Sequence, residues 1–266
     1  MSQSKPNPPK NATMIHADVV RVSNVTPNMI RVTLGGDDLA RFEPMGFDQW
    51  FRLFLPLAGE TNFALPKKID LLGYVQYLAM PKATRPPMRN YTVRAFRAAE
   101  RELDIDFVAH GDAGVASGWA ARTQPGDRVA LLDQGTMHNP VAGVDWQLFV
   151  TEESGLPAVA GILRDLPRDT RGHAFIEIEA MDDAQETGTP AGVEVHWVTR
   201  PAGEKPGVAA LAAVQALELP SGSFHTFVVG EQSLATSTRR WLVNEKGVPK
   251  SHVTFCGFWR HGAAAH

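Results

Sequence analysis

The pattern of apolar residues changes near residue 140, and this change limits the possible folds more than any other feature of the sequence. Before it, β-branched and aromatic residues form short runs, separated by turn residues such as Asn28, Gly35 and Gly36. The runs expected to form strands span residues 19–22, 29–34, 50–55, 90–98, 102–108 and 128–132. Many short strands at this spacing are typical of an antiparallel β-barrel or sandwich.

After residue 140, strand-like runs alternate with helical patterns. Strands are expected at residues 146–150, 173–180, 194–198, 224–229 and 253–258, and helices at 156–163, 207–217 and 233–244. Such alternation predicts a parallel α/β sheet. The chain of 266 residues is therefore expected to contain an antiparallel β-barrel domain at 14–140 and a parallel α/β domain at 141–266, after a flexible arm at 1–13.

Composition and charge exclude several classes of partner. The formal net charge is −3, so no general attraction to nucleic acid or to an anionic membrane is expected. No apolar segment approaches the roughly 18–20 residues of a membrane helix, and the polar, proline-rich start does not resemble a secretory signal. The single cysteine, Cys256, excludes an internal disulfide framework. We expect a cytoplasmic protein, although a disulfide-free exported protein fits the cysteine count as well.

The first candidate site is the strand at residues 89–94, which follows an irregular, proline-rich stretch at 57–88. Alternation along a strand places Arg89 and Tyr91 on one face and Thr92 on the other. An aromatic ring, an arginine and a hydroxyl together suit a flavin nucleotide, because they can pack on its ring, pair with its pyrophosphate and hydrogen-bond its polar edge. The alternative is an edge strand with two solvated arginines.

The second candidate site is the segment of small residues at 109–118. A strand ends at His110, and a short helix is expected to begin near Val115. Backbone N–H groups at a helix start can bind an anion, and Ser117 adds a hydroxyl. The alternative is an ordinary glycine turn that places Trp119 in the core.

Together, these two segments resemble the siderophore-interacting protein family, which consists of FAD-dependent ferric-siderophore reductases in the ferredoxin-reductase-like superfamily. The matching residues are Arg89 to Thr92 and His110 to Trp119, with Val115 where the family has proline. The resemblance extends to residues 151–158, where Glu152 replaces an aspartate and Gly155 an alanine, to 229–231 with the Arg239-Arg240 pair, and to the ending at 256–262. It therefore covers nearly the whole chain.

The resemblance implies three groups of site residues. FAD is expected to contact Arg89, Tyr91, Thr92, Val108, His110, Gly114, Ala116, Ser117 and Trp259. NADPH or NADH, the electron donor, is expected near Glu153, Ser154, Arg200, Glu231, Arg239 and Phe258, although the chain has no G-x-G-x-x-G segment. The ferric siderophore is expected near Arg52, Gln134 and Arg260. Because Gln134 stands where the family has arginine and Asp133 adds a negative charge, a less highly charged chelate is favoured.

The implied reaction passes electrons from the nicotinamide through FAD to Fe(III), and Fe(II) is then released in the cytoplasm. It needs no catalytic acid or base and no protein metal site, and the histidines show no metal-ligand spacing. Two alternatives remain open. One is a module that binds flavin or siderophore without turnover, and the other is a reductase that uses a ferredoxin-like partner or free flavin.

Overall fold

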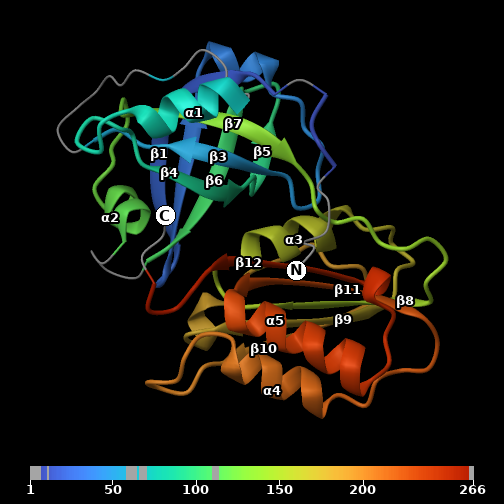
Figure 1. The fold of residues 1–266 in the computed structure, drawn as a ribbon. Helices are drawn as coiled ribbons and strands as arrows, with labels where there is room; N and C mark the ends of the chain where they lie inside the picture. Colours follow the sequence, from blue (N-terminus) through green and yellow to red (C-terminus); the bar gives the residue numbers. More distant parts are fainter. Residues whose placement is uncertain (1–6, 11, 58–64, 66–70, 110–113, 264–266) are drawn as a thin grey trace. The chain divides into compact units, whose positions relative to one another are not determined.

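The computed structural model describes residues 7–10, 12–57, 65, 71–109 and 114–263, which form two compact units (Figure 1). One unit contains Pro8–Met45 and Gln49–Gly135. The other contains the described residues from Thr136 onward, together with the short insertion Gly46–Asp48 and Asn7. Among the described residues, no helix combines the length and the apolar character that crossing a membrane requires.

The first unit is an antiparallel barrel. Its strands are β1 (Met14–Thr26), β2 (Met29–Gly35), β3 (Trp50–Phe54), β4 (Met88–Thr92), β5 (Ala95–Arg97), β6 (Glu102–Val108) and β7 (Arg128–Gly135), in the order β4-β3-β7-β1-β2-β6-β5. All pairs are antiparallel. The two end strands are halves of one segment, interrupted only at Val93 and Arg94, whose N–H groups donate to Gln49 and Asp104. The sheet therefore closes on itself.

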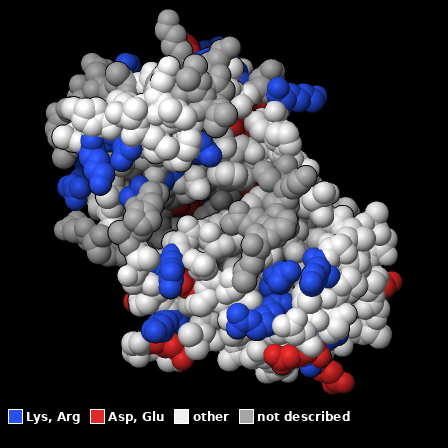
Figure 2. Space-filling model, viewed as in Figure 1, with Lys and Arg blue, Asp and Glu red and all other residues white. Residues whose placement is uncertain are grey.

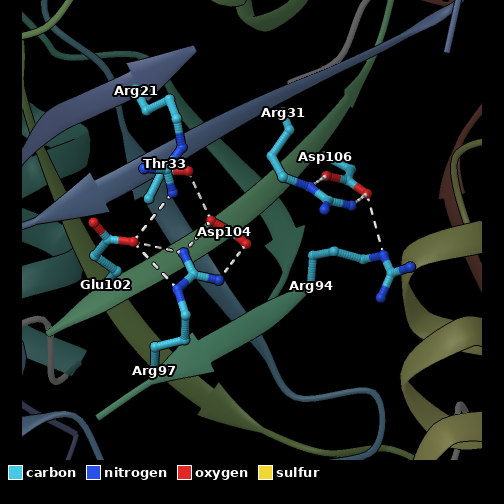
Figure 3. Close-up of polar contacts among 8 residues, drawn as sticks. All are labelled: Arg21, Arg31, Thr33, Arg94, Arg97, Glu102, Asp104 and Asp106. Carbon is cyan, nitrogen blue, oxygen red and sulfur yellow. Dashed lines mark hydrogen bonds and ion pairs between the residues drawn. The ribbon is translucent and has the colours of Figure 1, made fainter. Parts of the chain in front are cut away.

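Strand β6 shows how sequence alternation builds this barrel. Leu103, Ile105 and Phe107 are fully buried in the barrel core. The residues between them face the opposite side, because successive side chains of a strand alternate. There Glu102, Asp104 and Asp106 meet a row of arginines from β1, β2 and the β4–β5 segment, namely Arg21, Arg31, Arg94 and Arg97 (Figure 3). Charge pairing thus covers one side of β6 and apolar packing the other.

Two sequence predictions for this unit were wrong in detail. The stretch at 57–88, expected to be irregular, contains helix α1 (Leu71–Ala79). Its Tyr77 is buried against Phe54 with ring centroids 5.6 Å apart. Three of the prolines that suggested a loop, Pro81, Pro86 and Pro87, come after the end of this helix. The expected strand at 90–98 is also divided, into β4 and β5.

The second unit is a parallel α/β sheet, as the sequence predicts. Its strands are β8 (Trp146–Thr151), β9 (Gly172–Ile178), β10 (Val193–Thr199), β11 (Phe224–Glu231) and β12 (Val253–Trp259), and its helices are α3 (Leu156–Asp165), α4 (Val208–Ala216) and α5 (Gln232–Arg240). The order is β10-β9-β8-β11-β12, and every pair is parallel. The expected fold class, an antiparallel barrel followed by a parallel α/β domain, is confirmed.

The strand order reverses at β8, since β9 and β10 continue to one side of it and β11 and β12 lie on the other. In open parallel sheets, ligands bind beyond the carboxyl ends of the strands at such a reversal. The topology therefore directs attention to the ends of β8 and β11.

Candidate flavin and nucleotide sites

An aromatic chain joins the two candidate flavin segments of the barrel unit. The rings of Tyr91 on β4 and Phe107 on β6 have centroids 4.3 Å apart. Phe107 in turn lies 5.6 Å from Trp119 on helix α2 (Val115–Ala120). The strand with the Arg-Asn-Tyr-Thr sequence and the helix after the small-residue segment therefore meet in one corner of the barrel, which we call the aromatic corner.

The start of α2 leaves little room for larger side chains. Gly114 is the N-cap residue, and a Cβ atom added to it would lie 2.6 Å from Oγ of Ser117. That hydroxyl donates to the carbonyl of Gly114 at 3.2 Å, and Ala116 is buried. Within the part of the chain that the structure describes, no side chain caps this helix start. Small residues thus leave backbone N–H groups open to a ligand here, which suits the phosphate groups of a dinucleotide.

The other predicted flavin residues fall into three groups. Thr92 is buried at the end of β4, Val108 ends β6, and Arg89 donates from Nη1 to the carbonyl of Met88 at 2.8 Å, so all three belong to the barrel unit. Trp259 belongs to the α/β unit, where it ends β12. His110 lies outside the described residues.

Glu152, which directly follows β8, connects the strand ends of the α/β unit. Its carboxylate accepts hydrogen bonds from the N–H of Glu231 at 2.9 Å, Nε1 of Trp259 at 3.0 Å and the N–H of Ser154 at 2.9 Å, and from the Ser154 hydroxyl. These partners come from the ends of β8, β11 and β12. Burial, and then the charge of Glu153, raise the pKa of Glu152 to about 7. Glu152 therefore connects the ends of three strands at the position where the strand order reverses.

Arg200, which follows β10, lies between two carboxylates at the same edge. Its Nη1 is 2.9 Å from Glu153 and 2.9 Å from Glu177, and its Nη2 also contacts Glu153. Only 10% of the Arg200 side chain is exposed. Glu177 also accepts from the N–H groups of Gly207 and Ala210, where α4 begins. The positive charge of Arg200 is therefore already balanced within the unit.

The remaining predicted nucleotide residues lie in two places. Glu231 stays at the strand ends, where it caps α5 and accepts from the N–H of His261 at 3.1 Å. Phe258 is 39% exposed on β12. Arg239 lies farther along α5, over the ring of Phe255 at 4.8 Å, beside a cavity of about 210 Å³. The structure thus gathers Glu153, Ser154, Arg200 and Glu231 at one edge and separates Arg239 from them.

The predicted siderophore residues Arg52 and Gln134 lie on neighbouring strands. The guanidinium of Arg52 on β3 is 5.3 Å from the Tyr74 ring centroid. Trp50 pairs with Gly135 and Phe51 with Asp133, so β7 bulges at Gln134. Arg260 is an exposed residue that follows β12 in the other unit.

Asp133, which the sequence suggested would add a negative charge near the chelate, is buried. It is 5% exposed, and it accepts hydrogen bonds from Nε2 of Gln49 at 2.8 Å and from the N–H of Gly135 at 2.9 Å. Burial raises its pKa. The carboxylate therefore holds the bulge in place, and it repels an anionic ligand less strongly than the sequence suggested.

Sequence reasoning did not give Glu152 or Glu177 a role. The available signal was a pair of acidic residues, Glu152 and Glu153, directly after an apolar strand. On the face shown in Figure 2, Lys and Arg side chains of the described residues are scattered among uncharged ones, without one continuous basic surface. The overall charge distribution on this face therefore does not single out a binding site, and each basic residue has to be judged by its own contacts.

The chain matches two family models in succession. Residues 18–137 match the siderophore-interacting FAD-binding domain, and residues 144–262 match the siderophore-interacting protein domain. Together these matches span both units.

Individual relatives agree with the family matches. Ferric vibriobactin reductase ViuB of Vibrio cholerae is 30% identical over 92% of this chain and 89% of its own. An NADPH-dependent ferric-chelate reductase of Escherichia coli is 29% identical over 91% of each chain. The crystal structure of a siderophore utilization protein from T. fusca is 32% identical, with a TM-score of 0.80 over 98% of this chain and 96% of that one. The chain therefore belongs to the siderophore-interacting protein family, with an FAD-binding domain followed by a siderophore-interacting protein domain.

Proposed function

We propose that this chain is an FAD-dependent oxidoreductase that passes electrons from NADPH or NADH to the Fe(III) of a siderophore, so that Fe(II) is released in the cytoplasm. Membership of a family with an FAD-binding domain supports the cofactor. The relatives named as ferric vibriobactin reductase and NADPH-dependent ferric-chelate reductase support the acceptor and the donor. The single cysteine fits a reducing compartment.

The observation that carries the proposal is the aromatic corner. A flavin dinucleotide needs an apolar surface for its ring and N–H donors for its phosphates. Tyr91, with Phe107 and Trp119 behind it, supplies the first, and the backbone N–H groups at the start of α2 supply the second. Thr92 and Arg89 add a hydroxyl and a cation on the same strand. The residues present therefore fit FAD.

Bound FAD supplies chemistry that no side chain offers, since it takes up electrons as a pair and gives them up singly. The side chains of the protein bind and orient. At the carboxyl edge of the sheet, the buried carboxylates of Glu153 and Glu231 are engaged by Arg200 and by the start of α5, and so they hold in place the strand ends where a nucleotide is expected to bind. Ser154 adds a hydroxyl beside them. We assign the nicotinamide nucleotide to this edge, together with Phe258 and Trp259 at the end of β12.

For the iron chelate, we assign Arg52 and Gln134 of the barrel unit, while Arg260 of the α/β unit stays a prediction from the family resemblance. Arg52 has a defined orientation because it lies over the Tyr74 ring, and Gln134 occupies the bulge of the next strand. A cation beside a neutral amide attracts an anion less strongly than two cations do. We therefore assign a chelate of low negative charge. Until it is reduced, the iron stays bound by the chelate and needs no protein ligand.

The test is an anaerobic reduction experiment. The protein is loaded with FAD, its absorbance at about 450 nm is recorded, and NADPH or NADH is added. Loss of the flavin band, followed by its return when a ferric siderophore is added and by capture of Fe(II) with a coloured chelator, is the expected result. Failure to bind FAD contradicts the proposal. If only a reduced ferredoxin bleaches the flavin band, the electron donor is a ferredoxin and not a nicotinamide nucleotide.

A charge reversal separates the chelate site from the flavin site. Arg52→Glu should weaken ferric-chelate binding about tenfold or more, while the flavin content stays unchanged. Arg128→Glu makes the same change elsewhere on the barrel, at an exposed residue of β7, and should have little effect. Loss of flavin from Arg52→Glu would show that Arg52 belongs to the fold.

A further inference from the structure

Two histidines and a glutamate meet at the edge of the α/β sheet. His173 lies near the start of β9, and Glu194 and His196 lie near the start of β10, which is the edge strand. Glu194 is aligned with His173 across the parallel pair, and His196 follows two residues later. Residues two apart on a strand share a face, so all three side chains project from the same side of the sheet. The arrangement joins residues that are far apart in the sequence.

The three groups are spaced as the ligands of one metal ion. Nδ1 of His173 is 3.1 Å from Nε2 of His196. A carboxylate oxygen of Glu194 is 3.6 Å from the first nitrogen and 3.8 Å from the second. Atoms with these separations can all lie about 2.0–2.2 Å from a common point, which is the range of Zn–N and Zn–O bonds. No large movement is therefore needed to bring them to one ion.

Packing holds both imidazole rings in position. The ring of His196 stacks on Phe175 at 4.3 Å and 11°. His173 stands edge-on to Trp146 at 6.0 Å and 86°. The side chains of His173 and His196 are 18% and 28% exposed, whereas that of Glu194 is 67% exposed. Two ligands are thus fixed by the core and the third can adjust, while solvent reaches the open side.

The cluster is independent of the nucleotide edge. It lies at the amino ends of β9 and β10, whereas Glu152, Arg200 and Glu231 lie at or beyond the carboxyl ends of strands of the same sheet (Figure 1). None of its members pairs with those residues. An ion bound here would therefore leave the contacts of the nucleotide edge in place.

We propose that His173, Glu194 and His196 bind a divalent first-row transition metal ion such as Zn²⁺ or Fe²⁺. Two imidazoles and one carboxylate suit these ions, and three protein ligands leave further positions for water. Without metal, an N–H group of one imidazole donates a hydrogen bond to a ring nitrogen of the other. Binding requires only that the donor ring shift this proton to its second nitrogen, so both nitrogens face the ion and no proton is lost. This site replaces the expectation from sequence spacing that the histidines form no metal site.

The test is metal titration of the tag-free, FAD-loaded protein. Calorimetry with Zn²⁺ should give one equivalent with a dissociation constant on the order of micromolar. His196→Asn should weaken this binding at least tenfold. His16→Asn removes an exposed histidine from β1 in the other unit and should leave the binding unchanged. Anaerobic titration with Fe²⁺ shows whether the iron released by the reaction competes for the same site.

A second variant keeps the test decisive if His196→Asn fails to fold. Glu194→Gln changes a largely exposed side chain, so the fold should survive, and Zn²⁺ binding should still fall several-fold. Co²⁺ should give a visible absorption band, and both variants should need a higher Co²⁺ concentration to reach it. Absence of a bound equivalent in the wild type, or equal affinity in the wild type and both variants, overturns the proposal.

Discussion

Asp104 of the barrel and Glu152 of the α/β unit are both buried carboxylates, but their charge is balanced differently. On β6 of the barrel, Glu102 and Asp104 meet the guanidinium of Arg97 (Figure 3). Burial opposes the charge of Asp104, but hydrogen bonds from Arg97 and Thr33 outweigh it and lower its pKa. Glu152, at the edge of the α/β sheet, has only N–H and O–H donors and a charged neighbour, Glu153, so its pKa is raised. Asp104 is therefore held in an ion pair, whereas Glu152 keeps its proton to a higher pH than an exposed glutamate does.

This difference has a structural reason. Three consecutive outward positions of β6 face arginines of neighbouring strands at fixed register, so each charge can find a partner. The strand ends of a parallel sheet instead bring together loops that must stay accessible to a ligand. There Glu152 contacts only N–H and O–H donors, whereas the nearby Glu153 and Glu177 share Arg200. We therefore expect mutations of the two kinds of carboxylate to respond differently to pH.

Replacing Glu152 by glutamine should produce the largest effect. The folded protein holds a proton on Glu152 up to a pKa of about 7, whereas the unfolded chain releases it near 4.5. The wild type therefore loses stability as the pH rises from about 4.5 to about 7, by about 3 kcal/mol, and Glu152→Gln has no such proton to lose. Relative to the wild type, the variant should gain that much free energy of unfolding over this range.

Urea unfolding of both proteins at about pH 5 and about pH 7.5 measures this difference. A constant difference in the free energy of unfolding at the two pH values would show that Glu152 is already ionised at pH 5. The contrast between Glu152 and Asp104 would then disappear.

Replacing Asp104 by asparagine should cost about 2 kcal/mol of unfolding free energy. The change removes a buried carboxylate from Arg97 and Thr33, and the cost is moderated because Arg97 is 34% exposed. The cost should shrink at low pH, since the pKa of Asp104 is lowered on folding and its stabilisation is lost as the pH falls through that value. Asp18→Asn, which breaks an exposed pair with Arg128, should cost less than about 1 kcal/mol. Equal costs for the two variants would contradict a structural role for the β6 carboxylates.

Replacing Glu153 by glutamine should produce the smallest effect, seen in ligand binding. The change leaves Arg200 with one carboxylate, Glu177, and so gives the nucleotide edge a more positive charge. NADPH, with its extra phosphate, should then bind about fivefold more tightly relative to NADH. Fluorescence titration with both nucleotides checks this ratio, and Glu186→Gln supplies a control of the same charge change. An unchanged ratio of the two affinities would show that Arg200 does not influence the choice between NADPH and NADH.

The sequence predicted the fold well where local pattern decides it. The alternation of Glu102 to Phe107 specifies one apolar and one charged face, and the structure gives β6 the predicted bounds. The antiparallel and parallel halves follow equally from local pattern. Helix α1 was missed because its flanking prolines dominated the local signal.

The candidate sites were predicted less evenly, because some depend on pairing between distant segments. Tyr91 and Trp119 could be grouped because one strand separates their segments, and the structure brings them together through Phe107. Glu152 meets Glu231 and Trp259 only through strand order, and His173 meets His196 only through strand register. No local spacing encodes either contact.

The central claim is that the start of α2 and the strand β4 hold the same FAD molecule, and Ser117→Asp tests it most directly. Aspartate in the first turn of a helix favours the helix, so the fold should be kept, while its charge should repel the FAD phosphates. Titration with FAD should show affinity at least tenfold below that of the wild type and of Ser117→Ala, with an unchanged melting temperature. FAD binding by Ser117→Asp as tight as in the wild type would contradict the claim.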